Sequence, residues 1–299
     1  MFRRDEIRQF NTLISCFNLI GRIFNLGNAR SYHGRVCQVE FSVRPPWTRT
    51  PPGTLTPPRC ELADVLFVTF NGAEMRIAFL QAKSKNSAIS LPVKLDNAEQ
   101  FVVLAQKPLV TVWHCSPSSR WNDDVLSGAI LASVGSFGIF FGSPLTPVRF
   151  NYLIANLLHP VSGPNIAAGR PHLVSGSFDC ARPMPLGQYS YGFYERTECV
   201  GLRDFGAALF SLEIGTPIHA QVDQLSPKST NKLPASLNTR MALRKWTLSQ
   251  LADEPEDRLL IELLNSPHLQ DLPNEPVERD ISLGVKHVVI LNTSEMNGA

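Results

Sequence analysis

Two strongly apolar runs joined by Asn71-Gly72 make up the stretch CELADVLFVTFNGAEMRIAFLQAKSK, residues 60–85. An Asn-Gly pair between apolar runs is a strong short-range signal for a β-hairpin. Polar groups interrupt the runs near one end: Asp64 in the first, and Gln81 and Lys83 in the second. Because an unpaired buried charge is costly, we expect these side chains to be paired, hydrogen-bonded or bound to a ligand.

The length of the hairpin loop fixes which side chains face one another. With a two-residue loop, Asp64 lies diagonal to Gln81, and with a four-residue loop it faces Gln81 directly. In both registers Asp64, Gln81 and Lys83 project from one face, where directly opposed Cβ atoms lie about 5 Å apart. One divalent ion could then contact the carboxylate and the amide oxygen. The structural alternative is an Asp64–Lys83 salt bridge at the rim of the sheet.

The composition indicates a globular protein, with 299 residues of which 43% are hydrophobic and 18% charged. This length suits one large domain or two ordinary ones. Residues 1–120 carry 15 Lys and Arg against 8 Asp and Glu, whereas residues 121–299 carry 13 against 18. A basic first part is compatible with binding a polyanion such as nucleic acid, and equally with a solvated basic surface.

Cysteine and apolar patterns bear on the compartment. The six cysteines form no CxxC pair and the seven histidines show no zinc-finger spacing, which favours reduced thiols in a cytoplasmic protein. Residues 125–148 are uncharged over a length that could span a bilayer, but they contain four glycines, four serines and two prolines. A buried strand-turn-strand element is therefore expected there, and no association with a membrane.

Periodicity predicts the order helix, strand, hairpin, helix, strand in the first part of the chain. Around the hairpin, we expect a helix over residues 4–24, a strand over 35–43, a helix over 96–107 and a buried strand over 109–114. Three Pro-Pro pairs predict a surface insertion at residues 44–59.

The rest of the chain gives a weaker signal. We expect a core over residues 1–120, an elaboration of that core or a second subdomain over 121–223, a linker over 224–240, and a C-terminal helix-strand region over 241–299. Within the last region, the apolar run 285–291 predicts a strand.

This order of elements, with Asp64 on the second strand and Gln81-Ala82-Lys83 on the third, resembles the PD-(D/E)XK nuclease superfamily. The resemblance covers about residues 4–114, and the Gln-x-Lys variant is similar to that of Mrr-type restriction enzymes. It implies an α/β fold: a restriction-endonuclease-like αβββαβ core with a mixed central sheet, elaborated by a C-terminal α+β region. An amide replaces the second acid of the family motif, and no proline directly precedes Asp64.

The resemblance implies metal-dependent hydrolysis of phosphodiester bonds in nucleic acid, with DNA as the expected substrate and defence or restriction as the expected context. Mg²⁺ or Mn²⁺ would be held by Asp64, Gln81 and the Ala82 carbonyl. Lys83 would orient or deprotonate the attacking water, or neutralise the developing charge.

Further site residues implied by the resemblance are Glu6 in the first helix, Glu40 on the first strand and Gln100 in the following helix, with Glu61 as another carboxylate close by. Because loss of one negative ligand weakens metal binding, the alternative is a catalytically inactive nuclease-like domain. Such a domain would bind nucleic acid or a protein partner, and either reading allows a homodimer.

Overall fold

The computed structural model describes residues 11–15, 29–34, 38–41, 57–85, 93–94, 98–112, 121–123, 125–141, 149–161, 172–175, 187–220, 235–274 and 282–294. Glu6 and most of the Pro-rich segment 44–59 lie outside these residues.

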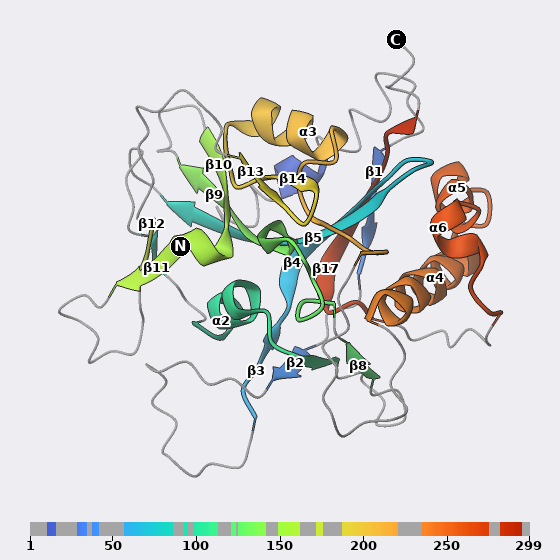
Figure 1. Ribbon diagram of the computed structural model, residues 1–299, viewed down its shortest axis with the longest axis horizontal. Coiled ribbons are helices and arrows are strands. Elements are labelled where there is room, and N and C mark those ends of the chain that lie inside the picture. Colours follow the sequence, from blue (N-terminus) through green and yellow to red (C-terminus); the bar gives the residue numbers. More distant parts are fainter. Residues whose placement is uncertain are drawn as a thin grey trace.

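A mixed sheet of eight strands forms the centre of the molecule (Figure 1). In spatial order its strands are β1 (Ala29–His33), β17 (Val285–Asn292), β4 (Ala63–Phe70), β5 (Met75–Lys85), β9 (Gly135–Phe141), β10 (Arg149–Ile154) and β15 (Glu198–Val200), and β16 (Thr216–Pro217) pairs with β5. The pairs β17–β4 and β5–β9 are parallel and the others are antiparallel. The expected α/β class with a mixed central sheet is confirmed.

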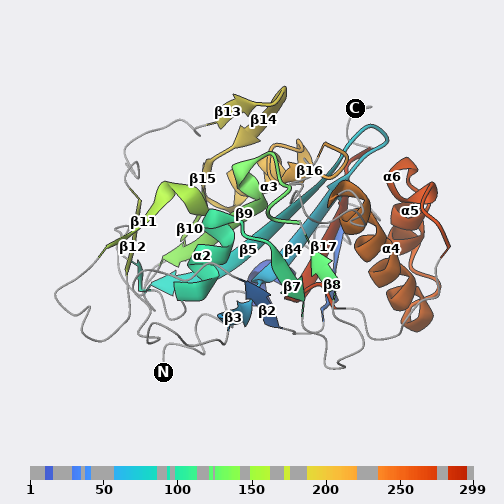
Figure 2. The same ribbon diagram turned by 60° about the horizontal axis from the view of Figure 1, so that its bottom comes forward.

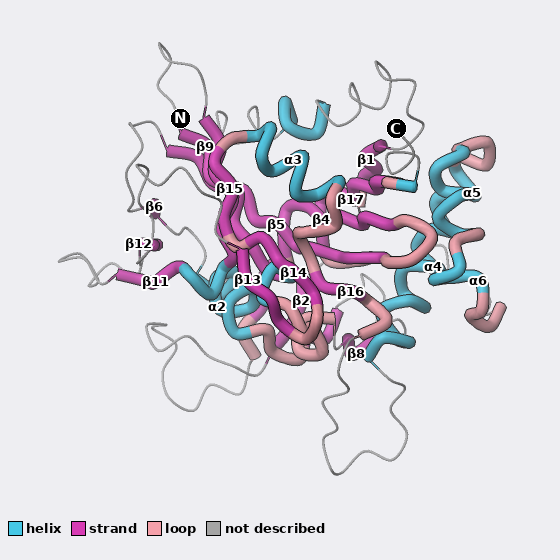
Figure 3. The backbone as a smooth tube through the Cα atoms, turned by 45° about the horizontal axis from the view of Figure 1, so that its top comes forward, coloured by secondary structure: helices cyan, strands magenta, loops and turns pink. Residues whose placement is uncertain are grey.

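Helices cover both faces of this sheet, which is why β4 is buried along its whole length. Figure 3 shows α2 and α3 on opposite sides of the strands. One apolar cluster joins one face to α2, α4, α5 and α6, and the other joins the opposite face to α3. In the described part of the chain, besides the helical residues 11–15, the helices are α2 (Ala98–Gln106), α3 (Leu202–Phe210), α4 (Ala235–Asp253), α5 (Arg258–Leu264) and α6 (Pro267–Gln270), with 3₁₀ turns η2 (Ala132–Val134) and η3 (Ala155–Leu157).

Among the described residues, three smaller sheets accompany the large one. Their strands are β3 (Arg59–Glu61), β2 (Gln38–Phe41), β7 (Val110–Val112) and β8 (Trp121–Asp123) in the first, β11 (Leu158–Val161), β12 (His172–Ser175) and β6 (Val93–Lys94) in the second, and β13 (Gly187–Ser190) and β14 (Phe193–Arg196) in the third. The sheet that contains β2 lies at the end of the large sheet where β4 begins (Figure 2).

The neighbours of the hairpin differ from the arrangement that the resemblance implies. The strands expected over 35–43 and 109–114 form as β2 and β7, but they pair with each other in the smaller sheet. The positions beside the hairpin are taken by β17 and β9. Apolar periodicity indicates that a segment is a strand, whereas its partner depends on distant parts of the chain.

Other expectations are met in part. Residues 11–15 are helical within the expected first helix, α2 forms within 96–107, and the strand at 285–291 forms as β17. Helix α4 begins at Ala235, inside the range expected as a linker, and residues 221–234 lie outside the described part.

No helix in the described ranges has both the length and the apolar character needed to cross a bilayer. The described part of the uncharged segment 125–148 contains turns, η2 and the buried strand β9 in the middle of the large sheet.

Candidate active site

The β4–β5 hairpin is closed by a four-residue loop that starts at Asn71. The amide of Asn71 donates to the Glu74 carbonyl at 2.9 Å, and Phe70 pairs with Met75. The Asn71 side chain stabilises the loop because its Oδ1 accepts from the amides of Ala73 at 2.8 Å and Glu74 at 2.7 Å. Of the two registers allowed by the sequence, the four-residue loop is the one that forms.

This register places Asp64 opposite Gln81 when the ladder is extended toward the start of β4. Residues Leu66 and Phe79 belong to the cluster beneath α2, so Asp64, Gln81 and Lys83 share that face by strand alternation. All three are buried, with exposed fractions of 6%, 3% and 6% in that order. The prediction that they gather on one face is confirmed.

Hydrogen bonds tie Asp64 to Gln81 and Ala82. Asp64 Oδ2 accepts from the Ala82 amide at 2.9 Å and from Nε2 of Gln81. The same Nε2 donates to the Ala82 carbonyl at 3.3 Å. One donor therefore contacts two of the three oxygens that the resemblance assigns to a metal ion.

A second lysine, absent from the sequence predictions, completes the cluster. Lys286 Nζ lies 2.7 Å from Asp64 Oδ1 and 2.8 Å from Glu61 Oε2. It stands near the start of β17, which runs parallel to β4, and Val285 pairs with Ala63. The structural alternative, a salt bridge between Asp64 and Lys83, does not form, and Lys286 from the C-terminal strand pairs with Asp64 instead.

The remaining predicted residues occupy different positions around this cluster. Gln100 on α2 is buried, and its Nε2 donates to the Glu61 carbonyl at 3.4 Å, so it contacts the main chain beside the site. Glu40 lies on β2 and pairs with the Arg59 guanidinium. Within the described residues, no hydrogen bond or ion pair involves Lys83. Glu6 falls outside them.

The fit of a metal ion depends on amide and main-chain oxygens. The described ranges contain no group of three or more His, Cys, Asp and Glu side chains that could hold one. Gln81 Oε1, however, is buried and lacks a hydrogen-bond partner among the described atoms. An orphaned acceptor beside a carboxylate is a donor set that suits a hard cation, and rotation of the amide can present Oε1 where Nε2 now points.

Charge at the site is balanced by Lys286. Burial by itself lowers the pKa of Lys286, but attraction and hydrogen bonding to Asp64 and Glu61 outweigh it and raise the pKa above its ordinary value. Lys286 is therefore an ammonium at neutral pH. On the neighbouring residue, burial and the nearby His33 lower the pKa of His287.

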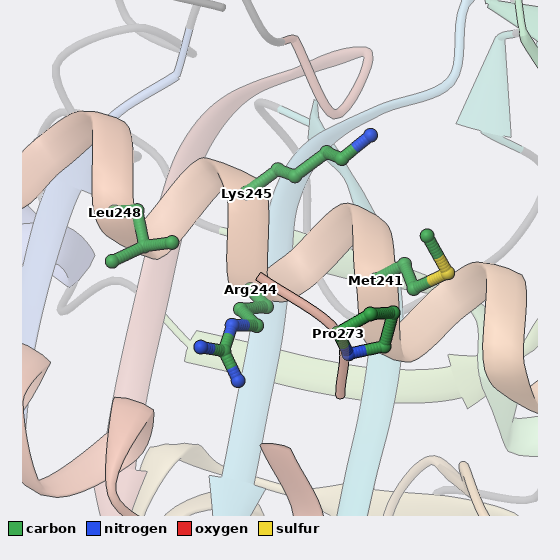
Figure 4. Close-up of a pocket in the computed structure, with 5 residues that line it drawn as sticks. All are labelled: Met241, Arg244, Lys245, Leu248 and Pro273. Carbon is green, nitrogen blue, oxygen red and sulfur yellow. The ribbon is translucent and has the colours of Figure 1, made fainter. Parts of the chain in front are cut away.

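A small pocket lies elsewhere, on α4, lined by Met241, Arg244, Lys245, Leu248 and Pro273 (Figure 4). The guanidinium of Arg244 donates to the carbonyls of Leu269 at 2.8 Å and Leu272 at 3.2 Å. This arginine therefore connects α4 to the segment around α6, and the pocket shares no residue with the Asp64 cluster.

The sequence did contain a signal for Lys286. A single charge near the start of an apolar strand marks both ADVLFV, with Asp64, and VKHVVI, with Lys286. Two apolar strands that carry opposite charges at the same position from their start are candidates for neighbours in a sheet.

No known protein family, curated protein or solved structure matches the chain. The chemistry of these residues is therefore the basis for a functional assignment.

Proposed function

We propose that the protein is a metal-dependent nuclease that hydrolyses phosphodiester bonds, with DNA as its substrate. The observation that carries this proposal is that Nε2 of Gln81 donates both to the Asp64 carboxylate and to the Ala82 carbonyl, so that these two oxygens and the Gln81 amide meet at one position. Along the chain, the β4–β5 hairpin is followed by α2, as the resemblance implies, whereas the strand that pairs with β5 in parallel is β9 and not the strand expected over 109–114.

The ligands for Mg²⁺ or Mn²⁺ would be Asp64, Gln81 through Oε1, and the Ala82 carbonyl. When bound, the ion would supply Lewis-acid stabilisation of phosphate charge and a water of lowered pKa. The unpartnered buried acceptor Gln81 Oε1 supports this role, because a buried polar atom is normally satisfied.

Lys83 supplies the positive charge for the phosphate. It lies on the same face of the hairpin as Asp64 and Gln81, is 6% exposed, and forms no hydrogen bond or ion pair with another described residue. A buried ammonium needs an anionic or polar partner, and a phosphate oxygen meets that need. Its expected action is to bind the scissile phosphate and stabilise the charge that develops in the transition state.

A second candidate function is favoured by Lys286. Its ammonium balances the charge of Asp64, a role that a metal ion would have in an active nuclease, as expected of a nuclease-like domain that binds nucleic acid or a protein partner without cutting. The two functions differ in one measurable property, which is metal-dependent cleavage.

The test incubates the purified full chain with supercoiled plasmid and with labelled DNA and RNA oligonucleotides in Mg²⁺, Mn²⁺ or EDTA. Asp64→Asn and Lys83→Met are compared with Asp271→Asn and Lys245→Met, which change the same residue types outside the site. We expect metal-dependent cleavage that falls about 100-fold or more in the first two variants only. Absence of cleavage of every substrate by the wild type, together with retained DNA binding, would favour the non-catalytic function.

A further inference from the structure

The ammonium of Lys286 bridges two carboxylates that come from consecutive strands. Its Nζ lies 2.7 Å from Asp64 Oδ1 and 2.8 Å from Glu61 Oε2. The main chain on both sides is fixed, because the Gly34 amide donates to the Lys286 carbonyl at 2.8 Å and the Leu62 amide donates to the Gly284 carbonyl at 3.1 Å. The main chain that carries the three charged residues is therefore held by hydrogen bonds directly after β1, directly before β17 and between β3 and β4.

Two carboxylate oxygens around one positive centre are also what a divalent cation prefers. Mg²⁺ binds carboxylate oxygens at about 2.0–2.1 Å, closer than an ammonium does. An ammonium and a divalent ion cannot share this position, since they would repel each other and need the same oxygens. Next to Asp64, whose carboxylate contacts the Gln81 amide, Gln81 Oε1 is a buried acceptor with no partner among the described atoms, which is a second observation in favour of a cation at this position.

Lys286 can leave this position without disruption of the sheet. The side chains of Lys286, Glu61 and Asp64 are 40%, 31% and 9% exposed, respectively. A lysine has a flexible four-carbon stem, so its ammonium can turn into solvent while β17 stays paired. Asp64, the less accessible of the two carboxylates, would then be a buried charge without a counter-ion and would need another cation.

We propose that Lys286 is an internal counter-ion that competes with the divalent cation for Asp64 and Glu61, so that metal binds only when the ammonium swings out. The proposal rests on the proposed function and deepens it, since it makes Glu61 a metal ligand and Lys286 a regulator of metal loading. The protein without metal is then a neutralised resting state. Once displaced, the ammonium stands at the rim of the site, where it can contact nucleic-acid phosphate.

The first test measures Mn²⁺ binding to the full chain by calorimetry, with MnCl₂ as the only ligand. We expect Lys286→Met to bind Mn²⁺ about tenfold more tightly than the wild type, because the competing charge is gone. Lys245→Met on α4 removes a lysine outside the site and should match the wild type. Adding Asp64→Asn to Lys286→Met should abolish the gain. Equal or weaker binding by Lys286→Met would overturn the proposal.

A second test uses the wild-type chain and needs no folded variant. The protein is acetylated briefly with acetic anhydride in EDTA or in saturating MnCl₂, and each lysine is quantified by peptide mass spectrometry. We expect the labelling of Lys286 to rise several-fold with Mn²⁺, since the ion frees its ammonium, while that of Lys245 stays constant. Unchanged or reduced labelling of Lys286 would overturn the proposal.

Cleavage assays keep this proposal separate from the proposed function. Tighter Mn²⁺ binding by Lys286→Met without DNA cleavage by the wild type would support the counter-ion and reject the nuclease. Metal-dependent cleavage with no change in Mn²⁺ binding on loss of Lys286 would support the nuclease and reject the counter-ion. Absence of Mn²⁺ binding by both wild type and variant would reject both.

Discussion

Lys286 Nζ lies 2.7 Å from Asp64 Oδ1 although the two residues are 222 positions apart in the chain. The contact forms because β17 inserts between β1 and β4 in the large sheet. Neither the hairpin nor the C-terminal strand makes this ion pair alone. Assembly of the candidate site therefore requires the same long-range pairing that completes the sheet.

The strength of this pair can be measured with a double-mutant cycle of Asp64→Asn and Lys286→Met. We expect a coupling of about 1 kcal/mol in the free energy of unfolding, because Asp64 is buried while Lys286 is 40% exposed. Urea denaturation of the four proteins gives the value. Added salt should reduce the coupling only in part, since the buried carboxylate is less screened than a surface charge.

A suitable control is the helical pair Arg258–Glu262, whose side chains are 74% and 27% exposed. An exposed i,i+4 pair contributes about 0.3–0.5 kcal/mol, so its cycle with Arg258→Met and Glu262→Gln should give the smaller coupling. A coupling for Asp64 and Lys286 no larger than that of the helical pair would contradict a site held together by charge.

Gln81→Glu tests whether the amide faces the metal position. Without metal, the new carboxylate would stand opposite Asp64, so we expect a lower melting temperature in EDTA from like-charge repulsion. With Mn²⁺, the added negative ligand should strengthen binding and give a larger metal-dependent rise in melting temperature than in the wild type. Thermal denaturation in both conditions measures the two effects. Weaker metal stabilisation in Gln81→Glu would indicate that Gln81 is not a ligand.

The hairpin loop offers a paired test of what Asn71-Gly72 contributes. Asn71→Ala removes an acceptor used by two amides, so we expect a loss of about 1 kcal/mol in unfolding free energy. Gly72 does not have a positive φ, and a Cβ placed there would meet no atom within 4 Å. Gly72→Ala should therefore be neutral or slightly stabilising. Urea denaturation compares the two, and a larger loss from Gly72→Ala would contradict the observed loop.

This loop also explains how much of the site could be predicted from sequence. The Asn-Gly signal located the hairpin, and alternation then placed Asp64, Gln81 and Lys83 on one face for either loop length considered. The loop type was less predictable, because Asn71 acts through its side chain and Gly72 is not needed for a left-handed conformation.

Long-range neighbours could not be predicted in the same way. An apolar strand such as β17 fits next to any other strand with two covered faces, and periodicity does not distinguish its place from that of β2. For this reason Lys286 was missed, although it is as unusual in its strand as Asp64 is. Likewise, β9 comes from an uncharged segment whose partner strand, β5, lies at least 50 residues earlier in sequence.

Two histidines make stability depend on pH. Partial burial is the main cause that lowers the pKa of His219 and of His287, followed by a neighbouring histidine in each case, His268 and His33. Because His219 is an exposed residue whereas His287 is half-buried, the contribution of His219 is the smaller one. A lowered pKa means that the unfolded chain binds more protons than the folded one between the folded-state pKa and 6.5. The stability that the two neutral histidines contribute is therefore fully present above pH 6.5, and it is lost as the pH falls toward their folded-state pKa values.

The pH dependence is tested by urea denaturation between pH 8 and pH 5 for wild type, His219→Gln and His287→Gln. Carboxylates also titrate in the lower part of this range, so the informative quantity is the difference between each variant and the wild type. We expect each variant to lose less stability than the wild type between pH 7 and pH 5, because glutamine binds no proton. Parallel profiles for the three proteins would contradict a role for these histidines. A steeper loss in either variant would mean that its imidazole is stabilised by protonation in the folded state.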